Sequence, residues 1–370
     1  MYLRKLTLLN FKNYPEASVT FSPGVNALVG PNGSGKTNLL DAVHYLSLTK
    51  SALNPVDVQN VRHGEGFFTV KGEYEREGKA LTVLVHVPTG QKKVVKANGA
   101  PYEKVSEHIG EIPLVLITPH DTDLIREGSE TRRKFVDGVL SQLDRGYLNT
   151  LMQYNHVLRQ RNALLKQFGE RRTFDADLLE PYTQKLSELG EPIHQRRKAW
   201  SEEFTPLVLQ YYAELADDQE AVGLQYESKW EPGTMMKRFG EVQDKDRILQ
   251  RSTLGVHKDD FVFNLGDHPL KKFGSQGQQK SFVIALKLAQ YAMFKNHFGF
   301  APLLLMDDIF DKLDDGRIER LMLQVSGPDY GQLLVTDARP ERTEAIFAAQ
   351  ELACKLVHIN KGSIEDTTTL

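Results

Sequence analysis

The sequence contains very little cysteine, no long apolar run and no excess of charge of one sign. A single cysteine, Cys354, among 370 residues allows no internal disulfide and no cysteine-rich zinc site, which favours a reducing compartment. No segment approaches the ~18 uninterrupted apolar residues of a membrane-spanning helix. The first residues alternate between polar and apolar types, unlike a secretory signal. We therefore expect a cytoplasmic protein that does not span a membrane.

The balance of charge excludes a uniformly basic nucleic-acid-binding protein. The chain has 46 Lys and Arg against 49 Asp and Glu, a formal net charge of −3. Any affinity for DNA or RNA must therefore come from a local patch. Apolar residues make up 40% of the chain and charged residues 26%, which is typical of a globular protein.

The spacing of apolar residues divides the chain into three parts. Residues 1–120 show short strand patterns separated by turns, with one helix beginning near Gly35. Residues 121–247 have the three-and-four spacing of helices, and interruptions such as Pro192 favour short packed helices over a long coiled coil. Residues 248–370 alternate strands and helices again. We predict an α/β head with a β-rich N-terminal lobe, made from the first and third parts, and an inserted helical arm.

A glycine-rich phosphate loop follows the predicted strand 25–29. The pattern consists of Gly30, Pro31, Asn32, Gly33, Ser34, Gly35, Lys36 and Thr37. It leads into a predicted helix that continues through Asn38. In such a loop the backbone amides surround phosphates, the lysine reaches the β- and γ-phosphate oxygens, and the threonine hydroxyl ligates Mg²⁺. The alternative is a glycine-rich turn without a ligand, but average composition would produce this pattern by chance in only about one chain of this size in a hundred. We predict that these residues bind ATP and Mg²⁺.

Two carboxylates end the buried strand predicted at residues 303–306. Asp307 and Asp308 are placed as in a Walker-B element, which brings acid groups beside the P-loop strand. Asp307 would hold Mg²⁺ together with Thr37, directly or through water, and Asp308 would orient or deprotonate the attacking water. The alternative is a buried strand that merely ends in polar residues. We predict ATP hydrolysis with Lys36, Asp307 and Asp308 as catalytic residues.

Residues 273–280 resemble the signature motif of ABC-type ATPases. Ser275, Gly277 and Gln278 stand at the matching positions, at the start of an amphipathic helix. The resemblance implies that this helix start meets the γ-phosphate bound by a second copy of the chain, where free amides and the helix dipole favour an anion. Residues 311–314 resemble the D-loop of the same enzymes. A simple helix cap is the alternative, and it would explain the glycine and serine but not the glutamines.

The order of these elements, together with residues 9–14, resembles the RecF family of bacterial recombination-mediator ATPases, which are related to SMC-type heads. The similarity covers the whole chain and includes residues 132–137, 160–162 and 255–261. It implies an ATP-dependent homodimer that binds DNA at single-strand gaps or duplex junctions. It also implies that the protein acts with RecR and RecO and helps RecA filaments to start in DNA repair and replication restart. By the same resemblance, Lys12 and Asn13 are expected to contact the nucleotide.

Three positions depart from the ABC pattern. Asp308 stands where those enzymes have a catalytic glutamate, and its shorter side chain predicts weak or partner-dependent hydrolysis. The switch histidine is missing, which leaves Thr336 or Asp337 to sense the γ-phosphate. No convincing Q-loop glutamine follows the predicted strand 114–117, where His120 is a candidate substitute.

Basic residues in the helical part are candidates for DNA contacts. Interleaved acidic residues are also consistent with solvated helix faces, and no base-reading motif is present, so the family resemblance carries most of this prediction. The residues that we expect to contact DNA are Arg132, Arg133, Lys134, Arg159 and Arg161. His257, Asp259 and Asp260 could be taken for a metal cluster, but neighbouring strand residues face opposite ways. We expect a structural or interface role for these three.

Three other functions remain open at this point. The ATPase subunit of an ABC transporter would need a membrane partner and would lack so large a helical insertion. Another SMC-type head would need a long arm, which the interrupted helical pattern does not favour. A small-molecule P-loop kinase would have no use for the element containing Ser275, Gly277 and Gln278.

Overall fold

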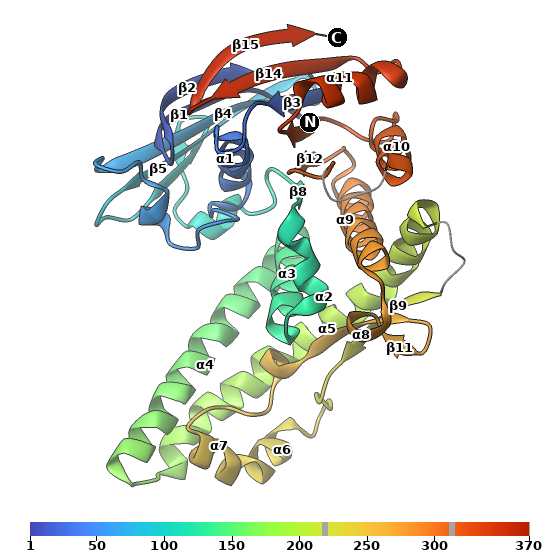
Figure 1. Ribbon diagram of the computed structural model, residues 1–370. Coiled ribbons are helices and arrows are strands. Elements are labelled where there is room, and N and C mark those ends of the chain that lie inside the picture. Colours follow the sequence, from blue (N-terminus) through green and yellow to red (C-terminus); the bar gives the residue numbers. More distant parts are fainter. Residues whose placement is uncertain (217–220, 311–314, 370) are drawn as a thin grey trace. The chain divides into compact units, whose positions relative to one another are not determined.

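The computed structural model describes residues 1–216, 221–310 and 315–369, and it divides into two compact units (Figure 1). The head comprises Met1–Thr122, Tyr211–Asp218 and Lys280–Leu370, and the arm comprises Asp123–Gln210 and Gln219–Gln279. The predicted boundary after residue 247 differs from this division. Residues 248–279 pack in the arm because β10 (Asp260–Leu265) pairs along its whole length with β9 (Val222–Glu227).

A largely parallel sheet contains the strands that lead into the P-loop and into the two aspartates at residues 307 and 308. Its strand order is β15-β14-β3-β13-β12-β8, and only β15 at the edge is antiparallel. The strands are β3 (Val25–Val29), β8 (Leu114–Ile117), β12 (Leu303–Met306), β13 (Leu333–Asp337), β14 (Cys354–Asn360) and β15 (Ser363–Thr369). The predicted strands 25–29, 114–117 and 303–306 are confirmed. Because parallel strands end at one edge, the loops after β3, β12 and β13 meet there.

The predicted β-rich lobe is a second six-stranded sheet, entirely antiparallel, in the order β2-β1-β4-β5-β6-β7. One hydrophobic core joins both sheets and α1, since Leu6, Leu39 and Leu305 belong to the same buried cluster. This packing holds the helix that follows the P-loop between the two sheets. The elements are β1 (Tyr2–Phe11), β2 (Tyr14–Thr20), α1 (Lys36–Leu48), β4 (Phe67–Arg76), β5 (Lys79–Pro88), β6 (Val94–Ala97) and β7 (Ala100–Pro101).

Further helices complete the head. Most of α9 (Gln276–Phe298) belongs to this unit, although its first turn lies in the arm. The other α-helices are α10 (Asp315–Val325) and α11 (Pro340–Ala349). Short 3₁₀ helices occur at η1 (Asp57–Asn60), η2 (Val105–His108) and η3 (Pro119–Thr122).

The arm is built around two long helices, so the expectation of short helices is wrong. Helix α4 (Arg145–Arg171) has 27 residues and α5 (Ala176–Leu215) has 40. Three prolines lie inside α5, and each removes a backbone donor. Burial of the apolar face of α5 compensates for the lost backbone hydrogen bonds, because Ile193, Trp200 and Phe204 are fully buried. Tertiary packing therefore overrides the local interruptions.

The remaining arm elements surround these helices. They include a small sheet in the order β11-β10-β9, of which β9 was not predicted from the helical spacing. None of the described helices is long and apolar enough to span a membrane. The elements are α2 (Asp123–Arg126), α3 (Ser129–Leu143), α6 (Met235–Glu241), α7 (Gln243–Leu249), η4 (Val256–Lys258), β11 (His268–Pro269) and α8 (Leu270–Phe273).

Candidate nucleotide-binding site

The P-loop turns tightly between β3 and α1. Gly30, Gly33 and Gly35 have φ angles of +148°, +77° and +119°, which L side chains rarely adopt. A Cβ on Gly30 would lie 2.1 Å from the Ile359 carbonyl oxygen. The Tyr14 hydroxyl donates to the Gly35 carbonyl at 3.0 Å. Backbone conformation and close packing therefore both require glycine in this loop.

Lys36 lies beneath the loop and is only 6% exposed. Its ammonium donates to the carbonyl oxygens of Gly30 at 2.7 Å and Pro31 at 3.0 Å. Burial lowers the pKa of Lys36, and the negative charge of Asp308 opposes this shift. A confined ammonium beneath a loop of glycines is suited to an anionic ligand.

Thr37 follows β3 and Asp307 follows β12, and the two side chains meet although these strands are not neighbours in the sheet. Strand β13 lies between β3 and β12, yet Thr37 Oγ1 donates to Asp307 Oδ1 at 3.0 Å. Thr336 Oγ1, at the end of β13, donates to the same oxygen at 2.8 Å and accepts the Asp308 amide at 2.8 Å. Burial raises the pKa of Asp307, and the charge of Asp308 raises it further. A hydroxyl beside a carboxylate is the oxygen donor set that Mg²⁺ prefers.

Asp308 has an uncommon backbone and an unsatisfied oxygen. Its φ is +50°, in the left-handed region that non-glycine residues seldom occupy. Among the described residues, its buried Oδ1 has no hydrogen-bond partner. Such strain and such an unpaired acceptor are typical of functional sites. The residues at this sheet edge therefore fit a metal ion and an attacking water.

Lys12 and Asn13 both contact residues of α1. The Lys12 ammonium pairs with the buried carboxylate of Asp41 at 2.5 Å. The Asn13 side-chain amide donates to the Ser34 carbonyl at 3.1 Å, and its oxygen accepts from Asn38 at 2.8 Å. Asn13 thus supports the P-loop backbone. Asp41 was missed, although a carboxylate inside the otherwise apolar segment 39–43 was a visible signal.

Of the two residues proposed to replace the switch histidine, only Thr336 contacts the acidic pair. Asp337 is fully buried and accepts from Arg342 Nε at 3.0 Å and Thr343 Oγ1 at 2.8 Å. Its carboxylate therefore organises the start of α11. His120, the Q-loop candidate, is exposed in η3.

The signature residues belong to the arm, whereas the P-loop belongs to the head. Ser275 Oγ accepts the Gln278 amide at 3.2 Å, and Gln278 Oε1 accepts the Ser275 amide at 2.6 Å. This is a capping box, and Gln279 also donates to the Gly274 carbonyl at 3.1 Å. The cap thus accounts for Gln278 and Gln279, two of the three glutamines that the sequence alone did not explain. Gly277 follows Ser275 in the first turn, and residues 311–314 lie outside the described residues.

The prediction that Arg161 contacts DNA is wrong. Its side chain is 1% exposed and pairs with the fully buried Asp246 at 2.7 Å. It also donates to Thr183 at 3.0 Å and to Ser252 at 2.7 Å. A guanidinium enclosed in this way cannot reach a phosphate, because it faces the interior between the arm helices.

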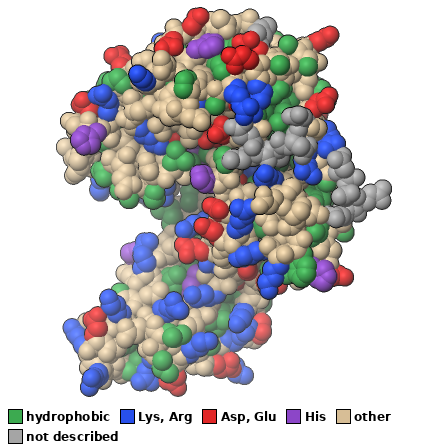
Figure 2. Space-filling view, viewed as in Figure 1, with side chains coloured by type: hydrophobic (Ala, Val, Ile, Leu, Met, Phe, Trp, Pro, Cys, Tyr) green, Lys and Arg blue, Asp and Glu red, His purple; other side chains and the backbone are tan. Residues whose placement is uncertain are grey.

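The other four candidates differ in exposure. Lys134 and Arg159 are exposed, and Lys134 pairs with the exposed Glu130, at 2.8 Å. Figure 2 shows basic and acidic side chains interspersed over the visible face of the arm. Arg132 and Arg133 instead contact the segment before β10, through the carboxylate of Asp260 and the carbonyl of Asp259.

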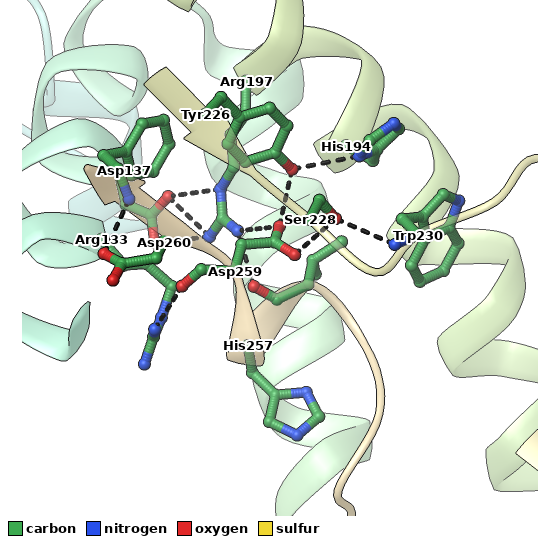
Figure 3. Close-up of polar contacts among 12 residues, drawn as sticks. Arg133, Asp137, His194, Arg197, Tyr226, Ser228, Trp230, His257, Asp259 and Asp260 are labelled. Carbon is green, nitrogen blue, oxygen red and sulfur yellow. Dashed lines mark hydrogen bonds and ion pairs between the residues drawn. The ribbon is translucent and has the colours of Figure 1, made fainter. Parts of the chain in front are cut away.

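A structural or interface role was expected for His257, Asp259 and Asp260, and all three bind other residues of the arm. Asp259 is buried within a polar network of arm residues (Figure 3). His257 Nδ1 is 2.8 Å from the Tyr154 hydroxyl oxygen. No group of three or more His, Cys, Asp or Glu residues in the described part of the chain is arranged to hold a metal ion.

Comparison with known proteins identifies the family. The RecF/RecN/SMC N-terminal domain family matches residues 2–359. The DNA replication and repair protein RecF of Flavobacterium johnsoniae is 48% identical over 359 residues, covering 97% of this chain and 100% of the relative. The RecF of Cytophaga hutchinsonii is 46% identical, covering 99% of this chain and 97% of the relative.

Solved structures agree with this relationship. The recombination mediator protein RecF with ATP, in the RecFOR pathway, is 27% identical with a TM-score of 0.87, covering 100% of this chain and 97% of that chain. An SMC head domain from Pyrococcus furiosus is 18% identical with a TM-score of 0.55, covering 100% of this chain and 96% of that chain, and shares the fold. The chain therefore belongs to the RecF family, and its head has the fold of an ABC-type ATPase.

Proposed function

We propose that this protein is an ATP-dependent recombination mediator of the cytoplasm. Two copies close on ATP at gapped DNA or at junctions of single and double strands, and together with RecO and RecR they promote loading of RecA. Full-length similarity to RecF proteins supports this function over a transporter subunit, another SMC-type head or a kinase. The observation that best supports ATP binding is the contact between Thr37 and Asp307 beside a P-loop that encloses Lys36.

The nucleotide site assigns a role to each group. The loop from Gly30 to Thr37, continued by Asn38, would surround the phosphates, and Lys36 would neutralise their charge. Thr37 and Asp307 would hold Mg²⁺, which would stabilise the charge that develops on the phosphates. Lys12 would exchange its pairing with Asp41 for a phosphate contact, while Asn13 would support the loop.

Hydrolysis would be slow because the candidate base is an aspartate. Asp308 would orient the attacking water through its unpaired oxygen, with its backbone held by Thr336. Its side chain is one methylene shorter than the glutamate of ABC enzymes, so its reach toward the water is reduced. Thr336 would sense the γ-phosphate because it contacts both acidic residues.

Closure would join two half-sites from separate copies. The P-loop and the signature each occur once in the chain. Ser275 is exposed at the start of α9, and Gly277 and Gln278 follow it in the first turn, where amides and the helix dipole favour an anion. These residues would meet the γ-phosphate held by the partner copy.

DNA contact would come from exposed basic groups of the arm. Lys134 and Arg159 have the necessary exposure. Binding through phosphates would be independent of sequence and would weaken steeply as salt is raised.

The central test is sedimentation with a non-hydrolysable ATP analogue, followed by binding to gapped duplex across a salt series. The natural chain should dimerise and bind DNA, whereas Lys36→Arg should lose nucleotide-driven dimerisation. Lys79→Arg, at an exposed site at the start of β5, is the matched control. A natural chain that stays monomeric with the analogue would refute the mechanism.

A second test separates the serine hydroxyl from its capping role. Ser275→Ala removes both, and loss of a helix cap alone costs about 0.5–2 kcal/mol. Ser275→Asn preserves the cap but lacks the hydroxyl. We expect both variants to bind nucleotide as monomers and to fail to dimerise. If Ser275→Asn closes normally, the hydroxyl does not bind the partner's nucleotide.

A further inference from the structure

Two adjacent carboxylates just before and at the start of β10 each bind an arginine of a different helix. Asp260 accepts from Arg132 Nε at 2.7 Å and Nη2 at 2.8 Å, a bidentate pair with α3. Asp259 accepts from Arg197 Nη1 of α5 at 2.9 Å. The planar guanidinium matches a carboxylate in direction as well as distance. Both pairs therefore fix the orientation of the chain that enters β10.

The pair at Asp259 is the centre of a larger network (Figure 3). Asp259 is 2% exposed and also accepts from the Tyr226 hydroxyl at 2.6 Å and Ser228 Oγ at 2.6 Å, both from the β9 region. Burial raises the pKa of Asp259, and the charge of Arg197 opposes that shift. Because both carboxylate oxygens accept hydrogen bonds from residues of different elements, Asp259 ties α5 to the β9 region.

Arg197 extends the anchor to a third element. It donates to both carboxylate oxygens of Asp137 on α3, at 2.9 Å and 3.0 Å, and to the Val256 carbonyl at 2.7 Å. Its side chain is 2% exposed. Helices α3 and α5 and the strand pair β9–β10 are thus joined by one buried guanidinium.

The anchored strand leads directly to the signature. After β10 the chain pairs back as β11, forms the single turn α8 and reaches Ser275. Leu270 of α8 is fully buried, and its carbonyl accepts the Gly274 amide at 3.0 Å. A Cβ on Gly274 would lie 2.8 Å from that carbonyl oxygen. Arg126 donates to Gln279 at 3.4 Å, which holds the first turn of α9 to α2.

We propose that the Arg132–Asp260 and Arg197–Asp259 pairs are positioning elements that hold the signature segment in place for closure over the nucleotide of a second copy. Arg132 then serves nucleotide-driven closure instead of binding DNA. This inference rests on the proposed function and deepens it. Arg132 is 12% exposed and Asp260 27%, so a DNA phosphate would have to displace a bidentate carboxylate to reach the guanidinium.

The test uses the full chain with Arg132→Gln, Asp260→Asn and the exchanged pair Arg132→Asp with Asp260→Arg. Lys134→Gln is the matched control, because it removes one charge from the same helix at an exposed site. Three quantities are measured: nucleotide affinity of the monomer, the dimerisation constant with a non-hydrolysable ATP analogue, and the thermal unfolding midpoint.

Both single variants should weaken dimerisation about tenfold, at the low end of what loss of a charge-assisted pair produces. Monomer nucleotide affinity should not change, the unfolding midpoint should shift little, and the exchanged pair should recover part of the dimerisation. Lys134→Gln should dimerise normally. Equal losses of nucleotide affinity and unfolding midpoint would indicate a merely structural pair and overturn the proposal.

Two further outcomes are distinguishable. If the natural chain dimerises and Arg132→Gln dimerises equally well but binds gapped DNA less tightly, Arg132 is a DNA ligand and this inference is refuted while the proposed function stands. If the natural chain itself does not dimerise, the proposed function is refuted and the inference is refuted with it.

Discussion

Replacing Arg161 should destabilise the arm without removing a DNA contact. Its guanidinium pairs with Asp246 at 2.7 Å, with side-chain exposures of 1% and 0%. Asp246 also accepts from the Thr253 amide at 2.8 Å and the Thr253 hydroxyl at 2.6 Å. The substitution Arg161→Met fills similar space but leaves a buried carboxylate whose remaining donors, among the described residues, are the neutral amide and hydroxyl of Thr253. The arm should therefore lose stability mainly because the buried Asp246 charge is no longer compensated.

The expected cost is about 3–5 kcal/mol, as found when one partner of a buried ion pair is removed. In a domain of roughly 150 residues, each kcal/mol lowers the unfolding midpoint by about 2–4 °C. The arm should therefore melt about 6–20 °C earlier. Arg159→Met is the matched control, because this arginine lies on the same helix but is exposed.

The assay is thermal unfolding followed by circular dichroism, with DNA binding measured well below the midpoint. Arg161→Met should bind gapped duplex normally at low temperature, whereas Arg159→Met should melt normally and bind less tightly. Unchanged melting of Arg161→Met would show that the buried pair contributes nothing. Normal melting combined with weakened DNA binding would return Arg161 to the DNA surface and refute the reasoning.

Two other predictions concern the P-loop and acid stability. Gly30→Ala should abolish binding of a fluorescent ATP analogue, because its Cβ would lie 2.1 Å from the Ile359 carbonyl oxygen. The control Gly24→Ala should bind the analogue normally, because a Cβ there would have no other atom within 4 Å. Burial lowers the pKa of His257 to about 4, so the unfolded chain takes up this proton first and stability falls as pH drops from 6.5 to about 4. His257 should contribute about 3 kcal/mol to the loss that urea unfolding shows over that range. His257→Gln should therefore reduce the loss by about that amount, and an unchanged pH dependence in that variant would contradict the assignment.

The local elements of the head were predictable because their signals are short-range. A buried parallel strand is a continuous apolar run, and the residues after it form the site edge, so the strand 25–29, the P-loop and Asp307 could all be located from the sequence. The sequence also indicated that Thr37 and Asp307 share one Mg²⁺, but their direct hydrogen bond depends on how β3, β13 and β12 are ordered in the sheet, which local patterns do not show. The choice of Thr336 over Asp337 likewise depended on which side chain Arg342 holds.

The arm shows the opposite relation between pattern and structure. Pro192 predicts a break by local rules, yet the buried face of α5 maintains one helix through it. Arg161 and Arg159 look alike in the sequence, and only burial distinguishes an interior ion pair from an exposed cation. Residue type and spacing were enough to predict the family, the phosphate loop and the order of the motifs. Which charges face solvent and which meet a partner became clear only in the folded chain, because those pairings join residues far apart in the sequence.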